Sequence, residues 1–246
     1  MCAGRNSCLN CFITVKDDFD SPLTGGAFIA AALMWWLGWM LLPVRIGTYF
    51  DPGVFGRIHE HFHYWIWMYR IHLFGMIVTV IALFALAALV ADSPSRVLIW
   101  PGAAVASSGM IVGALAAAFY YHHGAWGSLQ LAGKTPEAAQ AFVDALRVDT
   151  EYVTCLVRFG RVFGGLGLVV LAWGVWRYRI LSRCIGLGAG IIGLSAMALT
   201  MGLPDRLSYY QPIFHAQVLW MLATGVAILR RGVSTAQTQP SASGPN

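Results

Sequence analysis

Six long apolar runs determine what this chain can fold into. They cover residues 26–44, 70–91, 98–121, 161–177, 184–203 and 211–230. A run of about 18 or more apolar residues is long enough to cross a hydrocarbon core of roughly 30 Å. Only 11% of the 246 residues are charged, against about 25% in soluble domains, so the composition belongs to the membrane class. Because a spanning segment must satisfy its own backbone hydrogen bonds in lipid, all six runs are predicted to be helices.

The predicted fold is therefore an all-α, polytopic integral membrane protein, a compact bundle of six transmembrane helices. Residues 1–24 are predicted to be a polar, partly disordered N-terminal tail, residues 25–231 the membrane domain, and residues 232–246 a disordered tail. A long polar excursion at about 122–158 separates the third and fourth runs. An amphipathic helix is expected inside it and into the fourth run, because Thr135 suits an N-cap and Pro136 a first turn.

Small residues recur on the predicted spans at intervals of four. They are Gly109, Gly113 and Ala117 on the third, Gly160 and Gly164 on the fourth, and Gly186 and Gly190 on the fifth. Four-residue spacing aligns them on one face of a helix and lets backbones approach closely in lipid. The pattern predicts tight helix packing and carries no chemistry.

Arginines in the shortest links indicate the orientation. Arg177, Arg179 and Arg183 lie between the fourth and fifth runs, and Arg230 and Arg231 close the sixth. Short links rich in Lys and Arg favour the cytoplasmic side, so both termini are expected to be cytoplasmic, in a bacterial inner membrane. There is no basic run, so no nucleic-acid partner is expected. The expected partners are the lipid bilayer and either other membrane subunits or further copies of the chain.

Histidines gather toward one face of the predicted bundle. Four of the seven lie in the stretch "HEHFHYWIWMYRIH" at residues 59–72, two end the third run and one begins the sixth. Within six spans that share the side of both termini, all seven fall toward the same face; they are His59, His61, His63, His72, His122, His123 and His215. A histidine near the interface can simply be amphipathic, whereas ionisable residues inside spans tend to be functional.

A b-type haem fits this placement, because it needs one or two imidazoles from different helices at matching depth. Measured from the aromatic belt, His72 lies roughly 5 Å and His215 roughly 8 Å deeper than the nearest tyrosine. His72 and His215 are the first predicted ligands, and His123 is the next. Arg70, like Arg158 and Arg161, is a candidate partner for haem propionates, quinone or lipid phosphate.

A transition-metal site, for copper or iron, is the other cofactor that the pattern allows. If residues 55–91 form one helix, His59 and His63 stack on one stripe with Arg70, while His72 lies on a second stripe facing the interior. The metal would then take His59, His63, and His122 or His123, with an acid such as Glu60, Asp149 or Glu151.

The sequence assigns no catalytic residue. Phosphate-cradling glycine loops and G-x-S-x-G are absent, and no span carries an acid in its middle. The predicted function is a redox or oxygenase-type membrane subunit holding haem b or a transition metal at a histidine-lined site. The alternative is a cofactor-free structural or accessory subunit of a respiratory or photosynthetic membrane complex.

Overall fold

The computed structural model describes residues 5–47, 49–205 and 207–237, with side chains placed over 20–47, 49–205 and 208–230. Within these residues the chain is all-helical, which confirms the predicted fold class. The helices are α1 (Arg5–Met40), α2 (Pro52–Glu60), α3 (Phe62–Leu89), α4 (Arg96–Gln130), α5 (Pro136–Ala145), α6 (Arg147–Tyr178), α7 (Arg183–Gly202) and α8 (Leu207–Gln237). The predicted N-terminal tail overlaps α1 from Arg5 onward. Residues 238–246 of the predicted C-terminal tail lie outside the described residues.

Six of these helices are long and apolar enough to cross a membrane, and they coincide with the six predicted runs. Their spanning segments are Asp20–Met40, Phe62–Leu89, Arg96–Gln130, Arg147–Tyr178, Arg183–Gly202 and Ser208–Arg230. The protein is therefore an integral, multi-pass membrane protein. The bounds differ most for α4 and α6, because both helices continue through polar sequence beyond the apolar run.

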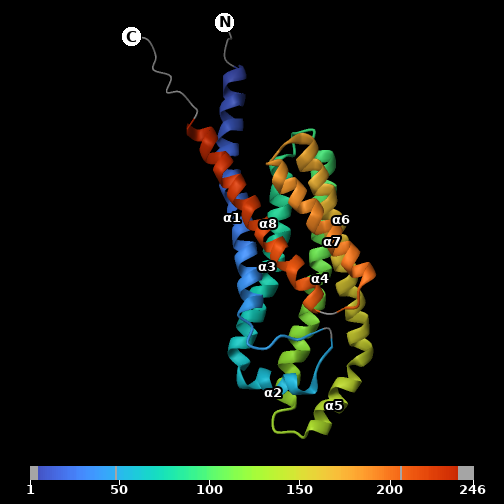
Figure 1. Cartoon of the computed structure of the whole chain (residues 1–246). Helices are drawn as coiled ribbons and strands as arrows, with labels where there is room; N and C mark the ends of the chain where they lie inside the picture. The colour runs from blue at the N-terminus through green and yellow to red at the C-terminus, as the bar shows by residue number, and fades with distance from the viewer. Residues whose placement is uncertain (1–4, 48, 206, 238–246) are drawn as a thin grey trace.

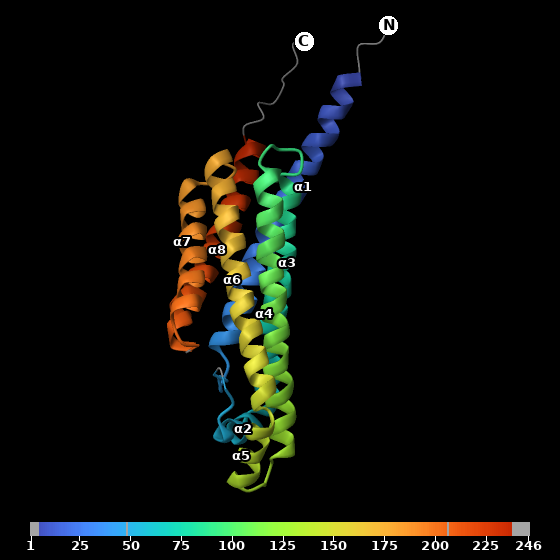
Figure 2. The same ribbon diagram turned by 90° about the vertical axis from the view of Figure 1, so that its right-hand side faces the viewer.

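The spanning helices pack in a closed ring (Figures 1 and 2). Its order is α1, α3, α4, α6, α7, α8 and back to α1, and each helix contacts both of its neighbours. The contact between α4 and α6 is the largest of the ring, and the contact between α7 and α8 is the smallest. The start of α1 and the end of α8 lie at one end of the ring, and α2 and α5 lie at the other.

Glycine lets α1 and α3 touch backbone to backbone. A Cβ added to Gly38 would overlap the backbone nitrogen of His72, and a Cβ added to Gly75 would overlap the backbone nitrogen of Trp35. No side chain fits at either position, so the crossing depends on both glycines. This crossing places Trp35 of α1 directly beside His72 of α3.

The glycine stripes on α4 and α6 meet in the same way. A Cβ on Gly109 would overlap the backbone of Gly164, and a Cβ on Gly160 would lie 2.9 Å from the carbonyl oxygen of Gly109. The predicted close packing of these spans is confirmed, because only a hydrogen at these positions allows the observed approach.

Beyond the ring, the chain forms a cap, which we define as residues 41–47, 49–61 and 121–158. Helices α4 and α6 have 35 and 32 residues, whereas α7 has 20. At ~1.5 Å per residue, α7 just crosses a hydrocarbon core of roughly 30 Å, and α4 and α6 exceed it by roughly 20 Å. The excess lies at the end that carries α2 and α5 (Figure 2). A second apolar cluster, including Phe55, Ile58 and Leu146, holds the cap together.

The amphipathic helix expected in the polar excursion is α5. The side-chain oxygen of Thr135 accepts a hydrogen bond from the backbone nitrogen of Ala138 at 3.4 Å, and Pro136 is the first helical residue. The predicted cap and first turn are therefore confirmed. After a break at Leu146 the chain continues as α6, as predicted for the entry into the fourth span.

The single helix considered over residues 55–91 does not form. Helix α2 ends at Glu60 and α3 begins at Phe62, with His61 between them at φ −118° and ψ 25°. The chain turns here because α2 lies across the end of the bundle (Figure 1), where Phe55 and Ile58 are buried in the cap. The stripe of His59, His63 and Arg70 on one helix is thus wrong.

Candidate ligand-binding cavity

A cavity of about 290 Å³ lies inside the ring, toward the cap. Its wall is mostly apolar, and glycines of α4 and α6 provide much of the space. Aromatic side chains line it; they are Trp35, Trp39, Tyr69, Tyr120, Tyr210 and Phe214. Polar side chains on the lining are few; they are His72, Thr154, Arg161, Asp205, Gln211 and Gln217. An apolar cavity with a small number of converging polar groups is the usual form of a small-molecule site.

His72 is the histidine of this cavity, and its side chain is buried. Its Nδ1 lies 3.1 Å from the backbone oxygen of Trp35. A carbonyl oxygen can only accept, so Nδ1 carries the proton and donates it. Burial disfavours the charged imidazolium, so the ring is neutral and Nε2 keeps a lone pair that can bind a metal or accept a hydrogen bond. The α1–α3 crossing at Gly38 sets this geometry.

Aromatic rings hold the imidazole of His72 in place. The ring centroid of Trp39 lies 5.4 Å away, that of Tyr69 6.2 Å and that of Phe214 6.5 Å. These separations are typical of favourable aromatic contacts, which restrict the orientation of the imidazole. His72 is therefore fixed both by its hydrogen bond to α1 and by packing from three helices.

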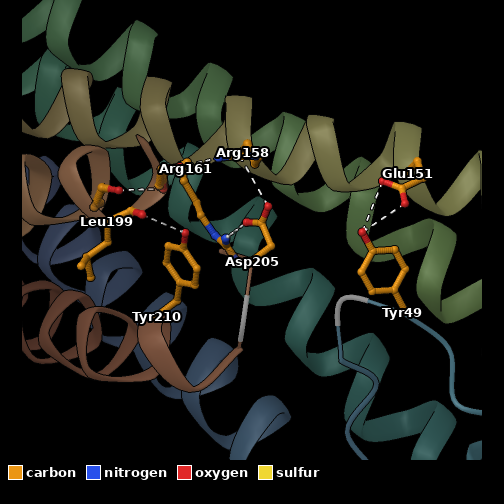
Figure 3. Close-up of polar contacts among 9 residues, drawn as sticks. Tyr49, Glu151, Arg158, Arg161, Leu199, Asp205 and Tyr210 are labelled. Atoms are coloured by element: carbon orange, nitrogen blue, oxygen red, sulfur yellow. Dashed lines mark hydrogen bonds and ion pairs between the residues drawn. The ribbon is translucent and has the colours of Figure 1, made fainter. Parts of the chain in front are cut away.

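Arg161 and Asp205 line the cavity, and Arg158 pairs with the same Asp205 carboxylate (Figure 3). Arg161 lies with Nη1 3.1 Å from Oδ1 of Asp205, and Arg158 with Nε 3.5 Å from Oδ2. Arg158 also donates from Nη2 to the backbone oxygen of Thr200 at 2.9 Å. These contacts tie α6 to the end of α7 and to the α7–α8 link. The group carries one net positive charge, from two guanidinium groups and one carboxylate.

Arg161 also stacks on α8. Its guanidinium carbon lies 3.5 Å from the ring centroid of Tyr210, and the Tyr210 hydroxyl donates to the backbone oxygen of Leu199 at 3.2 Å (Figure 3). A guanidinium over an aromatic face gains about 0.5–2 kcal/mol, depending on how far it is desolvated. Arg161 therefore joins α6, the α7–α8 link and α8 at the edge of the cavity.

We expect Arg161→Ala to destabilise the protein more than Arg158→Ala. The first change removes the shorter ion pair and the contact with Tyr210, which together are worth about 2 kcal/mol. The second removes a longer pair from a side chain that is 45% exposed, together with the hydrogen bond to the Thr200 oxygen, and the two contacts are worth about 1 kcal/mol. Thermal unfolding in detergent should show Tm lowered by about 4–8 °C for Arg161→Ala and by about 2–4 °C or less for Arg158→Ala. Equal shifts would contradict the unequal roles.

Residues 41–47 and 49–51 belong to a loop that closes the cavity on the side of the cap. Ile46 and Gly47 line the cavity, and the indole nitrogen of Trp65 donates to the backbone oxygen of Val44 at 2.9 Å. The Tyr49 hydroxyl donates to the Glu151 carboxylate at 3.2 Å (Figure 3). Partial burial and then the negative charge of Glu151 raise the pKa of the Tyr49 phenol. Tyr49 therefore stays a protonated donor at neutral pH and anchors the loop to α6.

The other predicted haem ligands lie away from this cavity. The nitrogen Nδ1 of His215 accepts a hydrogen bond from the indole of Trp36 at 3.2 Å, at an exposed site where α1 packs on α8. His123 belongs to the cap, and its Nδ1 lies 3.0 Å from the backbone oxygen of Phe119 on the same helix. Neither residue is among those lining the cavity with His72.

Arg70, the predicted partner of an anionic group, is exposed on α3. Its Nε donates to the Tyr121 hydroxyl at 2.9 Å, and its guanidinium lies 5.4 Å from the ring centroid of Trp67. Trp67 is exposed, so this group lies on the outer surface of the protein, away from the cavity.

The residues predicted to bind a transition metal are exposed on the cap or, like His63, directly beside it. His59, Glu60 and His63 flank the α2–α3 break, and His122 lies on α4 with its ring centroid 5.1 Å from that of His123. Among the residues whose side chains are placed, no group of three or more His, Cys, Asp or Glu is arranged to hold a metal ion.

Several cavity residues were not singled out from the sequence. Asp205 follows the fifth run, and its pairing with Arg158 and Arg161 brings together groups more than 40 positions apart. Gln211 and Gln217 are polar residues in the sixth run, a signal that could have marked an inward face. Gln217 and His215 lie two positions apart, and a helix turns them to nearly opposite sides, so only one of them can line the cavity.

No protein-family model, no curated protein and no solved structure matches this chain.

Proposed function

We propose that the protein is a redox-type membrane subunit whose cavity holds a redox-active cofactor bound through Nε2 of His72. The observation that carries this proposal is the hydrogen bond from Nδ1 of His72 to the Trp35 carbonyl. Histidines that bind metals or reacting groups nearly always donate their other nitrogen to a fixed acceptor, which sets the tautomer. A buried, neutral imidazole held in this way inside a membrane cavity supports a binding role for the remaining nitrogen.

Haem b is one cofactor that such an imidazole suits. The macrocycle supplies four nitrogens of its own, so a single cavity histidine is enough for axial ligation. Arg161 lies on the same cavity and could pair with a propionate. A bare copper or iron ion needs three or more nitrogen or oxygen ligands. Among the described residues, His72 and Asp205 are the only His, Cys, Asp or Glu residues on the lining. A metal-free redox-active ring bound by hydrogen bonds is the other cofactor class that fits His72.

The test is an optical spectrum of the purified protein, oxidised and reduced, with elemental analysis and organic extraction of the same sample. We expect a stoichiometric cofactor, seen either as a Soret band that shifts on reduction or as a redox-active compound in the extract. A colourless, metal-free protein whose extract holds no redox-active compound would falsify the proposal.

Both termini are proposed to be cytoplasmic, in a bacterial inner membrane. Arg177, Arg179 and Arg183 lie in or beside the α6–α7 link, at the same end of the ring as the termini, which supports this orientation. Two exposed cysteines provide the test, since Cys155 lies on the cap and Cys184 at the other end. A membrane-impermeant thiol reagent added to intact spheroplasts should label Cys155 and spare Cys184. The reverse pattern would invert the topology.

The alternative function is a cofactor-free accessory subunit of a respiratory or photosynthetic complex. The hydrogen-bonded pair of Trp36 and His215 favours it, because polar groups on an outer membrane face suit contact with another membrane subunit or a second copy of the chain. In that case the protein purifies without cofactor and together with its partner.

A further inference from the structure

The size and hydrogen-bonding polarity of the cavity point to one class of occupant. Resting on the proposed function, we propose that the cavity binds a quinol-class ring, a dihydroxylated aromatic head group with an apolar tail. One hydroxyl of the ring donates to Nε2 of His72, and the second oxygen faces the donors at the other end of the cavity.

The volume of the cavity limits the number of rings. At about 290 Å³ it is roughly twice the ~150 Å³ of an engineered apolar cavity that binds benzene, and it lies at the low end of the usual range for ligand sites. One substituted six-membered ring fits this space. A tetrapyrrole with its side chains requires the helices to move apart, and the glycine contacts between α1 and α3 and between α4 and α6 oppose that movement.

The hydrogen-bonding polarity of the cavity selects the reduced ring. Because the buried ring of His72 is neutral and its Nδ1 donates to Trp35, Nε2 can only accept, so it pairs with a hydroxyl and not with a quinone carbonyl. At the other end Arg161 offers guanidinium N–H groups, which pair with an oxygen acceptor. The site is therefore polarised, with an acceptor at one end and donors at the other.

The two ends are offset by about one helical turn. Arg161 stacks on Tyr210, and His72 packs near Phe214, four residues further along α8. Four residues correspond to roughly 6 Å along a helix axis. The cavity is also lined by flat aromatic faces, including Trp35 and Trp39, which suit a planar ring.

An apolar tail has a route out of the cavity. The seam between α7 and α8 is the smallest contact in the ring of helices, and α7 contributes a single small residue, Ala196, to the lining. A head group held between His72 and Arg161 therefore has lipid close behind this seam, where a tail can lie.

The test is equilibrium dialysis of a short-tailed benzoquinol, and of the matching benzoquinone, against the full-length protein in detergent. We expect saturable binding, with the quinol bound several-fold more tightly than the quinone. His72→Leu should weaken quinol binding roughly tenfold, the effect of one lost hydrogen bond in a dry site, and leave quinone binding nearly unchanged.

A cavity-filling variant tests the location. A Cβ on Gly164 meets nothing within 4 Å, and Gly164 lines the cavity, so Gly164→Leu should fill the cavity and abolish binding. The matched control is Gly26→Leu, because Gly26 is equally unobstructed but exposed on α1. If Gly164→Leu does not fold, Gly113→Ala is the milder variant, since its added carbon meets only the flexible end of Met76 at 3.1 Å.

The outcomes separate this inference from the proposed function. Loss of binding in the Gly164 or Gly113 variant and its retention in Gly26→Leu support both. Equal uptake of the probe by every variant, or tighter binding of the quinone than of the quinol, overturns the quinol assignment. A stoichiometric haem in the purified protein also overturns it, while the proposed function stands. Absence of any cofactor together with absence of probe binding overturns both.

Discussion

Replacing His72 by alanine is expected to remove the bound cofactor from the purified protein, whereas replacing His215 leaves it in place. The imidazole of His72 is buried on the cavity wall, and its tautomer leaves Nε2 as the binding atom. In metal sites, loss of a residue that only hydrogen-bonds to a binding side chain lowers metal affinity about 10- to 100-fold. Loss of the binding side chain itself should therefore reduce cofactor content at least ~10-fold. The ratio of cofactor to protein, from absorbance and from extraction, measures the effect.

His215→Ala and His123→Ala are the matched controls for this change. Both remove an imidazole, His215 from α8 and His123 from the cap part of α4, and neither residue lines the cavity. Thermal unfolding of all three variants separates loss of cofactor from loss of fold. Retention of cofactor by His72→Ala with loss in His215→Ala would place the site at the α1–α8 contact and refute the assignment to the cavity.

Gly38→Ala is expected to lower the stability of the bundle strongly, although it adds only one methyl group. That carbon would overlap the backbone nitrogen of His72, and a backbone cannot move aside as a side chain can. Overpacking at such a contact costs about 2–3 kcal/mol, which lowers Tm by roughly 5–10 °C in a protein of this size. Separation of α1 from α3 also lengthens the hydrogen bond between Trp35 and His72, so cofactor retention should fall as well.

The control for this prediction is the same substitution on the same helix. Gly26 is exposed on α1, and a Cβ there meets nothing within 4 Å. Gly26→Ala should leave Tm unchanged or raise it slightly, because alanine favours a helix by about 1 kcal/mol over glycine. Similar losses in Tm for both variants would show that α1 does not tolerate an added methyl group at either position, and the backbone contact would not be the cause.

Features that depend on nearby residues were predictable from the sequence. The six spans follow from runs of apolar residues, and α5 follows from Thr135 and Pro136 at its start. The close contact of α4 and α6 follows from glycines spaced by four. Each of these signals acts within one helix or between helices that are neighbours along the chain, so it can be read without knowledge of the full packing.

The candidate site depends on contacts between distant segments, which cannot be predicted from the sequence without knowing how the helices pack. The stripe argument predicted an interior position for His72, and the structure buries it on the cavity wall; its binding role stays a prediction. The break at His61 arises because α2 buries Phe55 and Ile58 across the end of the bundle. The pairing of Asp205 with Arg161, and the choice of Gln217 over His215 as a lining residue, depend on how α8 is rotated against α6.

Helices α4 and α6 continue from the bilayer into the cap, which limits where the chain can gain or lose residues. The cap is not an independent domain, because α4 and α6, which form the largest helix contact inside the membrane, also form part of the cap. An insertion or deletion of one residue within α4 or α6 would rotate the rest of that helix by about 100° and change which side chains line the cavity. Within the stretch from α4 to α6, variation in length is therefore confined to the turns beside α5.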